Sequence, residues 1–170
     1  MKNFTTLLEE TLEAWQDARQ GVIDELQNIP EEKWDFRPVP GVKSVQELAV
    51  HILEVAMLMT GELTRPDTNF KRAPWPELLK MYAAPAYRLH SKKDLLHLLV
   101  SQLEEGIKKF QAVGELRMLQ CIERFDGKSG TRLAWLNHGI AQEMYHRGQL
   151  TLYARLLGLE PALTRKIRGG

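Results

Sequence analysis

Hydrophobic residues recur every three or four positions in four long segments of the chain, a spacing typical of helices with one buried face. The first segment ends near Ile29 and Pro30, because the residue before a proline is disfavoured in helical geometry. The second begins at Ser44, which stands three residues before Glu47 in a capping-box pattern, and it runs to about Leu63. The apolar stripes of these two predicted helices are Phe4, Leu7, Leu8, Leu12, Trp15, Val22 and Leu26, and then Val45, Leu48, Ile52, Val55 and Met59.

A segment rich in proline and aromatic residues, 66–90, separates the second predicted helix from the third. We interpret it as a crossover that contains a short helix around Pro76–Met81, since proline is well tolerated at a first helical position. The third helix is predicted to start at Ser91, with Asp94 three residues later. Its inward stripe is Leu95, Leu99, Leu103, Ile107 and Phe110. Residues 114–130 fit either a short strand or an irregular return, with a turn at the sequence DGKSG.

The fourth predicted helix extends from about Thr131 to Leu157, with Gly158 at its C-terminal cap and Pro161 shortly after. Apolar residues occupy two opposite sides of it, so it is either buried within the bundle or covered by a partner. These sides are Leu133, Leu136, Ile140 and Met144, opposite Trp135, Gly139, Leu150, Tyr153 and Leu157. No polar and apolar alternation is long enough for a sheet. We therefore predict one domain, 1–170, of the all-α class: an antiparallel four-helix bundle with a long crossover.

The composition is that of a folded globular protein, with 44% hydrophobic and 26% charged residues. Lys and Arg (23) nearly balance Asp and Glu (22), so the charge provides no footprint for a nucleic acid or an anionic membrane. The N-terminus lacks a signal peptide's apolar run, and no stretch approaches the roughly 18 apolar residues of a membrane span. With Cys121 as the lone cysteine, we expect a cytoplasmic protein. The basic cluster Arg165, Lys166 and Arg168 is interpreted as a solvated tail.

The chain has five histidines, which fall into two groups. His90 and His97 lie at the edge of the third helix and are predicted to be surface residues. His51 shares the inward face of the second helix, where a hydrogen-bonded core histidine and a metal ligand are both consistent with the pattern.

On the fourth helix, His138, Gln142 and His146 are spaced four apart, and side chains at this spacing can reach one metal ion. His138 and His146 differ by about 12 Å along a helix axis, so both can hardly bind the same ion. A single-metal site must therefore combine Gln142 with one of them. Glutamine is an uncommon ligand for zinc or nickel, and the spacing alone leaves a metal centre open.

Three features resemble the DinB/YfiT-like superfamily of bacterial metalloenzymes. The run EEKWDFRPVPGVKSVQELAVHILEVA is similar to the family's Trp- and Pro-containing loop, Ser-capped helix and inward histidine. The order and lengths of the predicted helices also agree. The stretch MYHRGQLTLYARLLGLEP resembles the family's histidine followed by Arg-Gly-Gln-Leu and a Leu-Gly-rich helix end. The resemblance covers essentially the whole chain.

This resemblance implies a bundle, usually dimeric, that holds a divalent ion, zinc or nickel in many members. Carried across residue by residue, the ligands are His51, Gln142 and His146. The family usually has histidine at the position of Gln142, or glutamate in thiol-dependent isomerase relatives. We expect this departure to weaken chelation, because an amide oxygen is a poorer donor than imidazole. His138 stays open as a substitute ligand.

Two functions follow from the resemblance. The first is a metal-dependent enzyme, an S-transferase or isomerase that uses a small thiol, or a hydrolase, acting on a small molecule. In it Glu54 either orients His51 or is an ordinary solvated or ion-paired residue. The alternative is a degenerate, non-catalytic helical dimer with a binding or stress-associated role, in which His51, Gln142 and His146 form a hydrogen-bonded cluster without an ion. The family signature also contains Arg147, for which a structural or inter-subunit role is expected, and Gln149. No catalytic residue is assigned.

Overall fold

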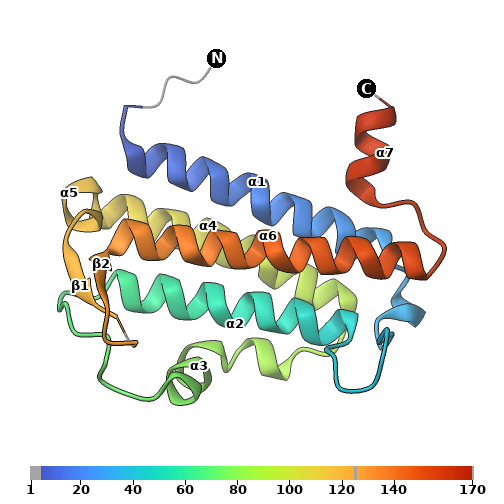
Figure 1. Cartoon of the computed structure of the whole chain (residues 1–170), viewed down its shortest axis with the longest axis horizontal. Coiled ribbons are helices and arrows are strands. Elements are labelled where there is room, and N and C mark those ends of the chain that lie inside the picture. The colour runs from blue at the N-terminus through green and yellow to red at the C-terminus, as the bar shows by residue number, and fades with distance from the viewer. Residues whose placement is uncertain (1–4, 125, 170) are drawn as a thin grey trace.

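Four long helices form the body of the protein. The structure, a computed structural model, describes residues 5–124 and 126–169. The long helices are α1 (Leu7–Asn28), α2 (Val45–Leu63), α4 (Lys92–Val113) and α6 (Arg132–Leu156). α1 and α6 run in one direction and α2 and α4 in the other (Figure 1). α1 packs against α6 and α4, and α2 packs against the same two helices. The predicted all-α four-helix bundle is confirmed.

The ends of the helices that carry the candidate ligands are fixed by the residues expected from the sequence. The Ser44 hydroxyl accepts a hydrogen bond from the Glu47 amide at 3.2 Å, and the Glu47 carboxylate accepts one from the Ser44 amide at 2.9 Å. This is the predicted capping box, and it fixes where α2 begins. At the other end of the site, α6 starts at Thr131, whose hydroxyl accepts from the Ala134 amide. Gly158 ends it with φ of +76°, a conformation that favours glycine.

The crossover between α2 and α4 contains α3 (Trp75–Ala83), which confirms the short helix predicted around Pro76–Met81, and a 3₁₀ turn at Ala86–Arg88. A second such turn, Glu31–Lys33, follows α1. The crossover is tied to α2 by Glu62, a buried carboxylate that pairs with Arg72 and accepts a hydrogen bond from the Tyr82 hydroxyl. These contacts place α3 below α2 in the view of Figure 1.

Between α4 and α6, the described residues form both a helical turn and two strands. α5 (Glu115–Met118) is followed by an antiparallel pair, β1 (Cys121–Glu123) and β2 (Ser129–Thr131), in which Cys121 lies opposite Thr131. The short strand left open by the sequence is therefore present. A sheet was not expected, since strands of three residues are too short to show alternation. The buried Arg132 donates to the carbonyl oxygens of Leu63 at 2.9 Å and Asp67 at 2.6 Å, which connects this hairpin to the end of α2.

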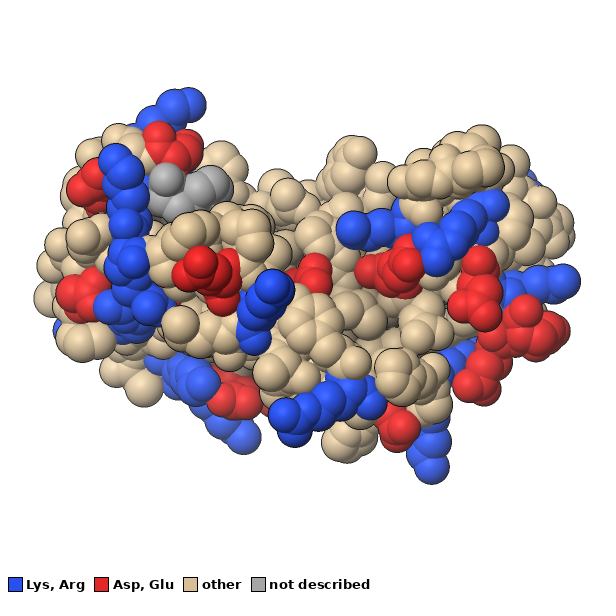
Figure 2. Space-filling view, turned by 90° about the horizontal axis from the view of Figure 1, so that it is seen from below, with Lys and Arg blue, Asp and Glu red and all other residues tan. Residues whose placement is uncertain are grey.

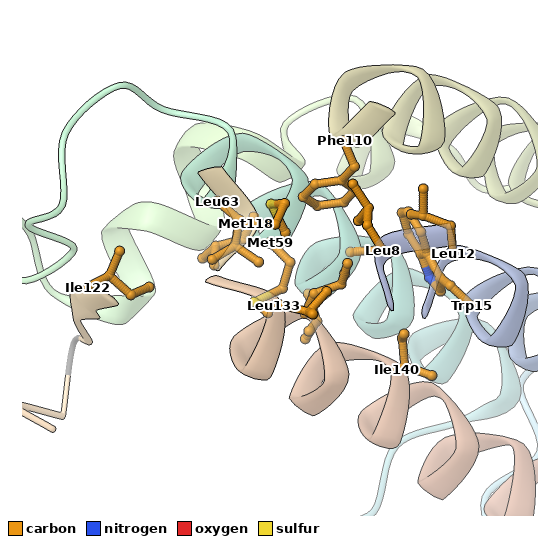
Figure 3. Close-up of a cluster of buried hydrophobic side chains, with 14 of the residues drawn as sticks. Leu8, Leu12, Trp15, Met59, Leu63, Phe110, Met118, Ile122, Leu133 and Ile140 are labelled. Atoms are coloured by element: carbon orange, nitrogen blue, oxygen red, sulfur yellow. The ribbon is translucent and has the colours of Figure 1, made fainter. Parts of the chain in front are cut away.

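The interior is made of two apolar clusters, one toward each end of the bundle. The cluster in Figure 3 joins α1, α2, α4 and α6, and its labelled members are Leu8, Leu12, Trp15, Met59, Leu63, Phe110, Met118, Ile122, Leu133 and Ile140. The second cluster contains Trp34, Ile52, Leu95 and Leu150 among others. Burial of such side chains is worth about 1.5–3 kcal/mol each, which makes the bundle rigid enough to position side chains between its helices.

A charged pair is also buried within the bundle. Arg19 on α1 and Glu143 on α6 form two parallel hydrogen bonds of 2.7 and 2.6 Å, and their side chains are 0% and 3% exposed. The Trp15 indole donates to the same carboxylate at 2.7 Å, and Arg19 also donates to the side chain of Gln102. Because a buried charge must be paired, this network fixes the rotation of α6 against α1. Glu143 directly follows Gln142, so the network also fixes the side of α6 that carries the candidate ligands.

The C-terminal segment differs from the sequence expectation. The solvated tail predicted around Arg165 instead forms helix α7 (Ala162–Arg168), although its basic side chains are exposed as expected. The buried carboxylate of Glu25 accepts hydrogen bonds from the amides of Ala162 at 3.1 Å and Leu163 at 3.3 Å. This contact from α1 supplies acceptors for the free N–H groups at the start of α7 and explains why the segment is helical.

Acidic and basic side chains are interspersed over the face shown in Figure 2, and neither sign forms a broad patch there. Among the helices of residues 5–124 and 126–169, none combines the length and the apolar character that a bilayer span requires.

Candidate metal centre

His51 of α2 and His146 of α6 face each other across the contact between these helices. Their ring centroids are 5.0 Å apart and the rings are nearly perpendicular, at 81°. His146 is only 7% exposed, so the pair lies at the edge of the core rather than on the open surface. The inward orientation predicted for His51 is therefore observed. His90 and His97 are exposed, as expected.

His51 is oriented by a carboxylate. Its Nδ1 lies 2.7 Å from Oε2 of Glu54, three residues further along α2. Burial disfavours the ionised form of Glu54, but hydrogen bonds from His51 and Tyr87 outweigh it and keep the pKa of Glu54 below its usual value. An ionised Glu54 accepts the Nδ1 proton of His51, which leaves the Nε2 lone pair of His51 free to bind a ligand. Burial and the Glu54 hydrogen bond in turn raise the pKa of Tyr87 to about 12.

His146 is held from both of its ring nitrogens. Nδ1 lies 2.7 Å from Oε1 of Gln149, and Nε2 lies 3.0 Å from Oε1 of Gln142. Burial is the main reason that the pKa of His146 is lowered, so the ring is neutral at pH 7 and carries one proton. With that proton on Nδ1 and donated to Gln149, the Nε2 lone pair faces the Gln142 oxygen, and both atoms are acceptors. A cation between Nε2 and Oε1 satisfies both atoms; without one, the amide of either Gln142 or Gln149 is rotated so that its NH₂ group donates to the ring.

The spacing of these donor atoms fits a shared divalent ion. Two ligands at the usual zinc distances, about 2.0–2.1 Å with tetrahedral angles, lie about 3.3 Å apart, close to the 3.0 Å between His146 Nε2 and Gln142 Oε1. The outer nitrogens of both imidazoles are hydrogen-bonded, as is usual for metal-binding histidines. In the part of the chain that the structure describes, no group of three His, Cys, Asp or Glu could hold an ion. A site with three protein donors would therefore need a donor of another kind, and the Gln142 amide is the candidate.

His138 is placed away from this pair. It is exposed, and its ring lies 5.2 Å from that of Trp135, with the two planes at 63°. The structure thus brings together His51, Gln142 and His146, the set implied by the family resemblance. Sequence reasoning missed the contact of Gln149 with His146, although its spacing of three residues on one helix was a usable signal. The Arg147 guanidinium lies against Gly21 of α1, where an added Cβ would be 2.3 Å from Arg147 Cζ, so this residue packs α6 onto α1.

Two cavities flank the histidine pair along α2 and α6. The larger, about 520 Å³, is lined by polar and charged side chains, including Arg37, Lys43, Glu47, His51 and Glu54. The smaller, about 200 Å³, is lined by Val55, Met59, Trp75, Trp135, His138, Gly139 and Gln142. A small molecule can therefore approach the candidate centre through a cavity with charged side chains and through one without them.

The fold and this histidine pair define a helical-bundle protein with a candidate metal centre between its second and last long helices. The DinB family model matches residues 1–168, and the chain belongs to the DinB family. Among curated proteins, none matches the sequence significantly.

Solved structures show the same fold. A DinB-like protein from Bacillus subtilis, YjoA, is 21% identical with a TM-score of 0.66, over 88% of this chain and 92% of that one. YfiT from Bacillus subtilis, described as a probable metal-dependent hydrolase with an unusual four-helix bundle topology, is 12% identical with a TM-score of 0.70 over 94% and 95%. A mycothiol-dependent maleylpyruvate isomerase is 14% identical with a TM-score of 0.69, over 88% of this chain and 63% of that one. At these identities the likeness supports the fold alone.

Proposed function

We propose that this protein is a metal-dependent enzyme that activates a small thiol or a water molecule for attack on a small-molecule substrate. The observation that carries the proposal is the 3.0 Å approach of His146 Nε2 and Gln142 Oε1 beside a second imidazole whose outer nitrogen is held by a carboxylate. Zinc or nickel is the expected ion, since both accept imidazole ligands. When bound, the ion would supply Lewis acidity that lowers the pKa of a coordinated thiol or water.

The chain's own residues prepare this site. Glu54 keeps the proton of His51 on Nδ1, and Gln149 does the same for His146, so both Nε2 atoms are available as donors. The buried Arg19–Glu143 pair prevents α6 from rotating away from α2. Gln142 is a neutral and exposed ligand, which makes its contact with an ion weaker than that of a histidine.

Two of the structural neighbours are named for reactions in which an activated thiol or water molecule attacks a substrate. One is a mycothiol-dependent isomerase and the other a probable metal-dependent hydrolase. A thiol and a water molecule both attack faster once deprotonated, so one centre serves either chemistry. Their names support the class of reaction for this chain and leave S-transfer, isomerisation and hydrolysis as its candidate forms.

The competing function is a non-catalytic binding protein. The same geometry favours this function if the Gln142 amide is rotated. The NH₂ group of Gln142 then donates to His146, and the hydrogen bonds of the cluster are complete without an ion. Metal content distinguishes the two.

We also propose that the protein is a cytoplasmic homodimer. The second apolar side predicted for α6 is covered by the bundle, since Gly139, Leu150 and Tyr153 are buried. Of the first predicted side, Leu133, Leu136 and Ile140 are buried but Met144 is exposed, and it borders further exposed apolar residues, Tyr145, Leu152 and Leu156. Exposed apolar patches mark association sites, and the exposed free thiol of Cys121 suits a reducing compartment. Sedimentation of Leu152→Glu against the unmodified protein tests the dimer.

The test of function is the metal content of untagged protein, measured by inductively coupled plasma mass spectrometry. We expect near-stoichiometric zinc or nickel that is lost in both His51→Ala and His146→Ala. His97→Ala removes an exposed imidazole from α4 and serves as the matched control, with unchanged metal content. His138→Ala should also keep its metal, and a loss there would make His138 the ligand. Protein that is metal-free and takes up neither added zinc nor nickel would establish the non-catalytic alternative.

A further inference from the structure

The smaller of the two cavities beside the candidate centre has an unusual lining. It lies between α2, α3 and the first half of α6, and its volume is about 200 Å³. None of its lining side chains carries a fixed charge, and two of them are indoles, Trp75 and Trp135. His138 adds a third flat ring, which is exposed to solvent. A site of this composition takes a flat, uncharged group and excludes an ion, since an ion would lose its hydration there without a partner.

Trp135 is held in place as a wall of this cavity. The Arg124 guanidinium lies 4.5 Å from the centre of its ring, and His138 meets its ring edge to face. Arg124 is itself paired with Asp126 at 2.8 Å, so its charge is directed to that carboxylate. A wall that is fixed before a ligand arrives costs less ordering entropy on binding.

The floor of the cavity is rigid as well. Met59 belongs both to the lining and to the buried cluster of Figure 3. Opposite it is Gly139, where an added Cβ would lie 3.3 Å from Cγ of Met59. Glycine at this position allows Met59 to pack closely against the backbone of α6.

Gln142 connects the cavity to the candidate centre. It lines the cavity, and its Oε1 lies 3.0 Å from Nε2 of His146. A group bound in the cavity is therefore separated from the histidine pair by one side chain. The larger cavity is lined by several charged side chains and the smaller one by none, so the two spaces differ in the charge that they can hold.

We propose that the smaller cavity binds an uncharged aromatic group of the substrate, about the size of one six-membered ring. The indoles supply edge-to-face or stacked contacts in addition to area burial, which favours an aromatic over an alkyl ring. At the mouth of the cavity, His138 can accept a hydrogen bond from a polar substituent of the ring or donate one to it. That this group belongs to a substrate rests on the proposed function, whereas the binding itself does not.

The experiment is a titration of the full chain with p-cresol, followed by the indole N–H signals in ¹H–¹⁵N spectra. The chain has four tryptophans, and two of them, Trp15 and Trp34, are buried away from the cavity and serve as internal controls. We expect the signals of Trp75 and Trp135 to shift and saturate while the other two stay in place. No shift at millimolar p-cresol, or equal shifts of all four, would overturn the proposal.

Two comparison ligands test the charge and the aromaticity without altering the protein. Benzoate has the same ring with a negative charge, and cyclohexanol has a similar size without aromaticity. Each should bind about tenfold more weakly than p-cresol, and equal affinity for either one contradicts the inference. Trp135→Ala should weaken p-cresol binding by about tenfold, with Trp135→Phe restoring most of it.

The titration is run on protein with its metal content measured in parallel, before and after treatment with EDTA. Binding of p-cresol by protein that takes up no metal supports the cavity and refutes the proposed function. Metal uptake without p-cresol binding refutes the cavity proposal and leaves the proposed function standing. The failure of one proposal is therefore distinguishable from the failure of the other.

Discussion

Replacement of Glu54 tests the candidate centre most directly, because this residue contacts one ligand and is not itself a ligand. In Glu54→Gln the amide oxygen can still accept the Nδ1 proton of His51, but the negative charge is lost. In Glu54→Ala both the charge and the acceptor are lost. The contact being removed is a 2.7 Å hydrogen bond between side chains that are 23% and 17% exposed.

The size of the effect follows from this geometry. Removal of a group that orients a metal-binding histidine costs about 10–100-fold in metal affinity. We expect Glu54→Gln to lower the metal affinity about tenfold, or about 1.4 kcal/mol, because one hydrogen bond persists. Glu54→Ala is expected to lower the metal affinity about 100-fold, or about 2.8 kcal/mol, since only a water molecule can replace the lost carboxylate as acceptor.

The assay is competition for zinc against a fluorescent chelator at pH 7, with folding checked by circular dichroism. Glu105→Gln is the matched control, since Glu105 pairs with Lys109 on the exposed side of α4, and its zinc affinity should equal that of the unmodified protein. Folded Glu54→Ala that binds zinc within twofold of the unmodified protein would refute the orienting role. Loss of affinity in the control as well would show a general charge effect instead.

Three further predictions concern stability. Glu143→Ala leaves the charge of Arg19 buried without its partner and should lower the free energy of unfolding by about 3–5 kcal/mol in urea titrations; a loss below about 1 kcal/mol would contradict this. Gly148→Ala, in mid-α6 with no heavy atom near its added Cβ, should raise the free energy of unfolding by about 0.5–1 kcal/mol in the same assay. The pKa of Glu47 is lowered to about 2, mainly by its hydrogen bond with Arg37, so its contribution is present above pH 4.5 and is lost as the pH falls toward 2. The urea midpoints of Arg37→Ala and the unmodified protein should therefore converge over that range, and a constant difference would show that the pair does not titrate with folding.

The four long helices could be predicted because their signals are local. The capping serine Ser44, the proline after Ile29 and the glycine at 158 act within one turn of the residues they affect. The β1–β2 hairpin has three-residue strands and gives no periodic signal. α7 depends on Glu25, which is 137 residues earlier than Ala162, and a contact at that separation leaves no pattern in the segment itself.

The candidate ligands could be named from helical spacing and a family resemblance, but their surroundings could be named only in part. Glu54 and Gln149 each lie three residues from the histidine they contact, so their positions were readable as neighbours on a helix face. The walls of the smaller cavity could not be predicted from the sequence. Trp75 and Trp135 come from separate elements, and a tertiary arrangement of the crossover against α6 brings them to one space.

The buried pair of Arg19 and Glu143 has a consequence for the newly made chain. The two residues are 124 positions apart, and at roughly 5–20 residues per second the ribosome takes about 6–25 seconds to pass from one to the other. During that interval the first helix emerges with a guanidinium in the middle of its apolar side and no carboxylate to receive it. Premature collapse of α1 onto the helices made before α6 is thereby penalised, and the incomplete chain keeps this helix hydrated. Because Glu143 supplies the missing partner, we expect closure of the bundle to follow the synthesis of α6.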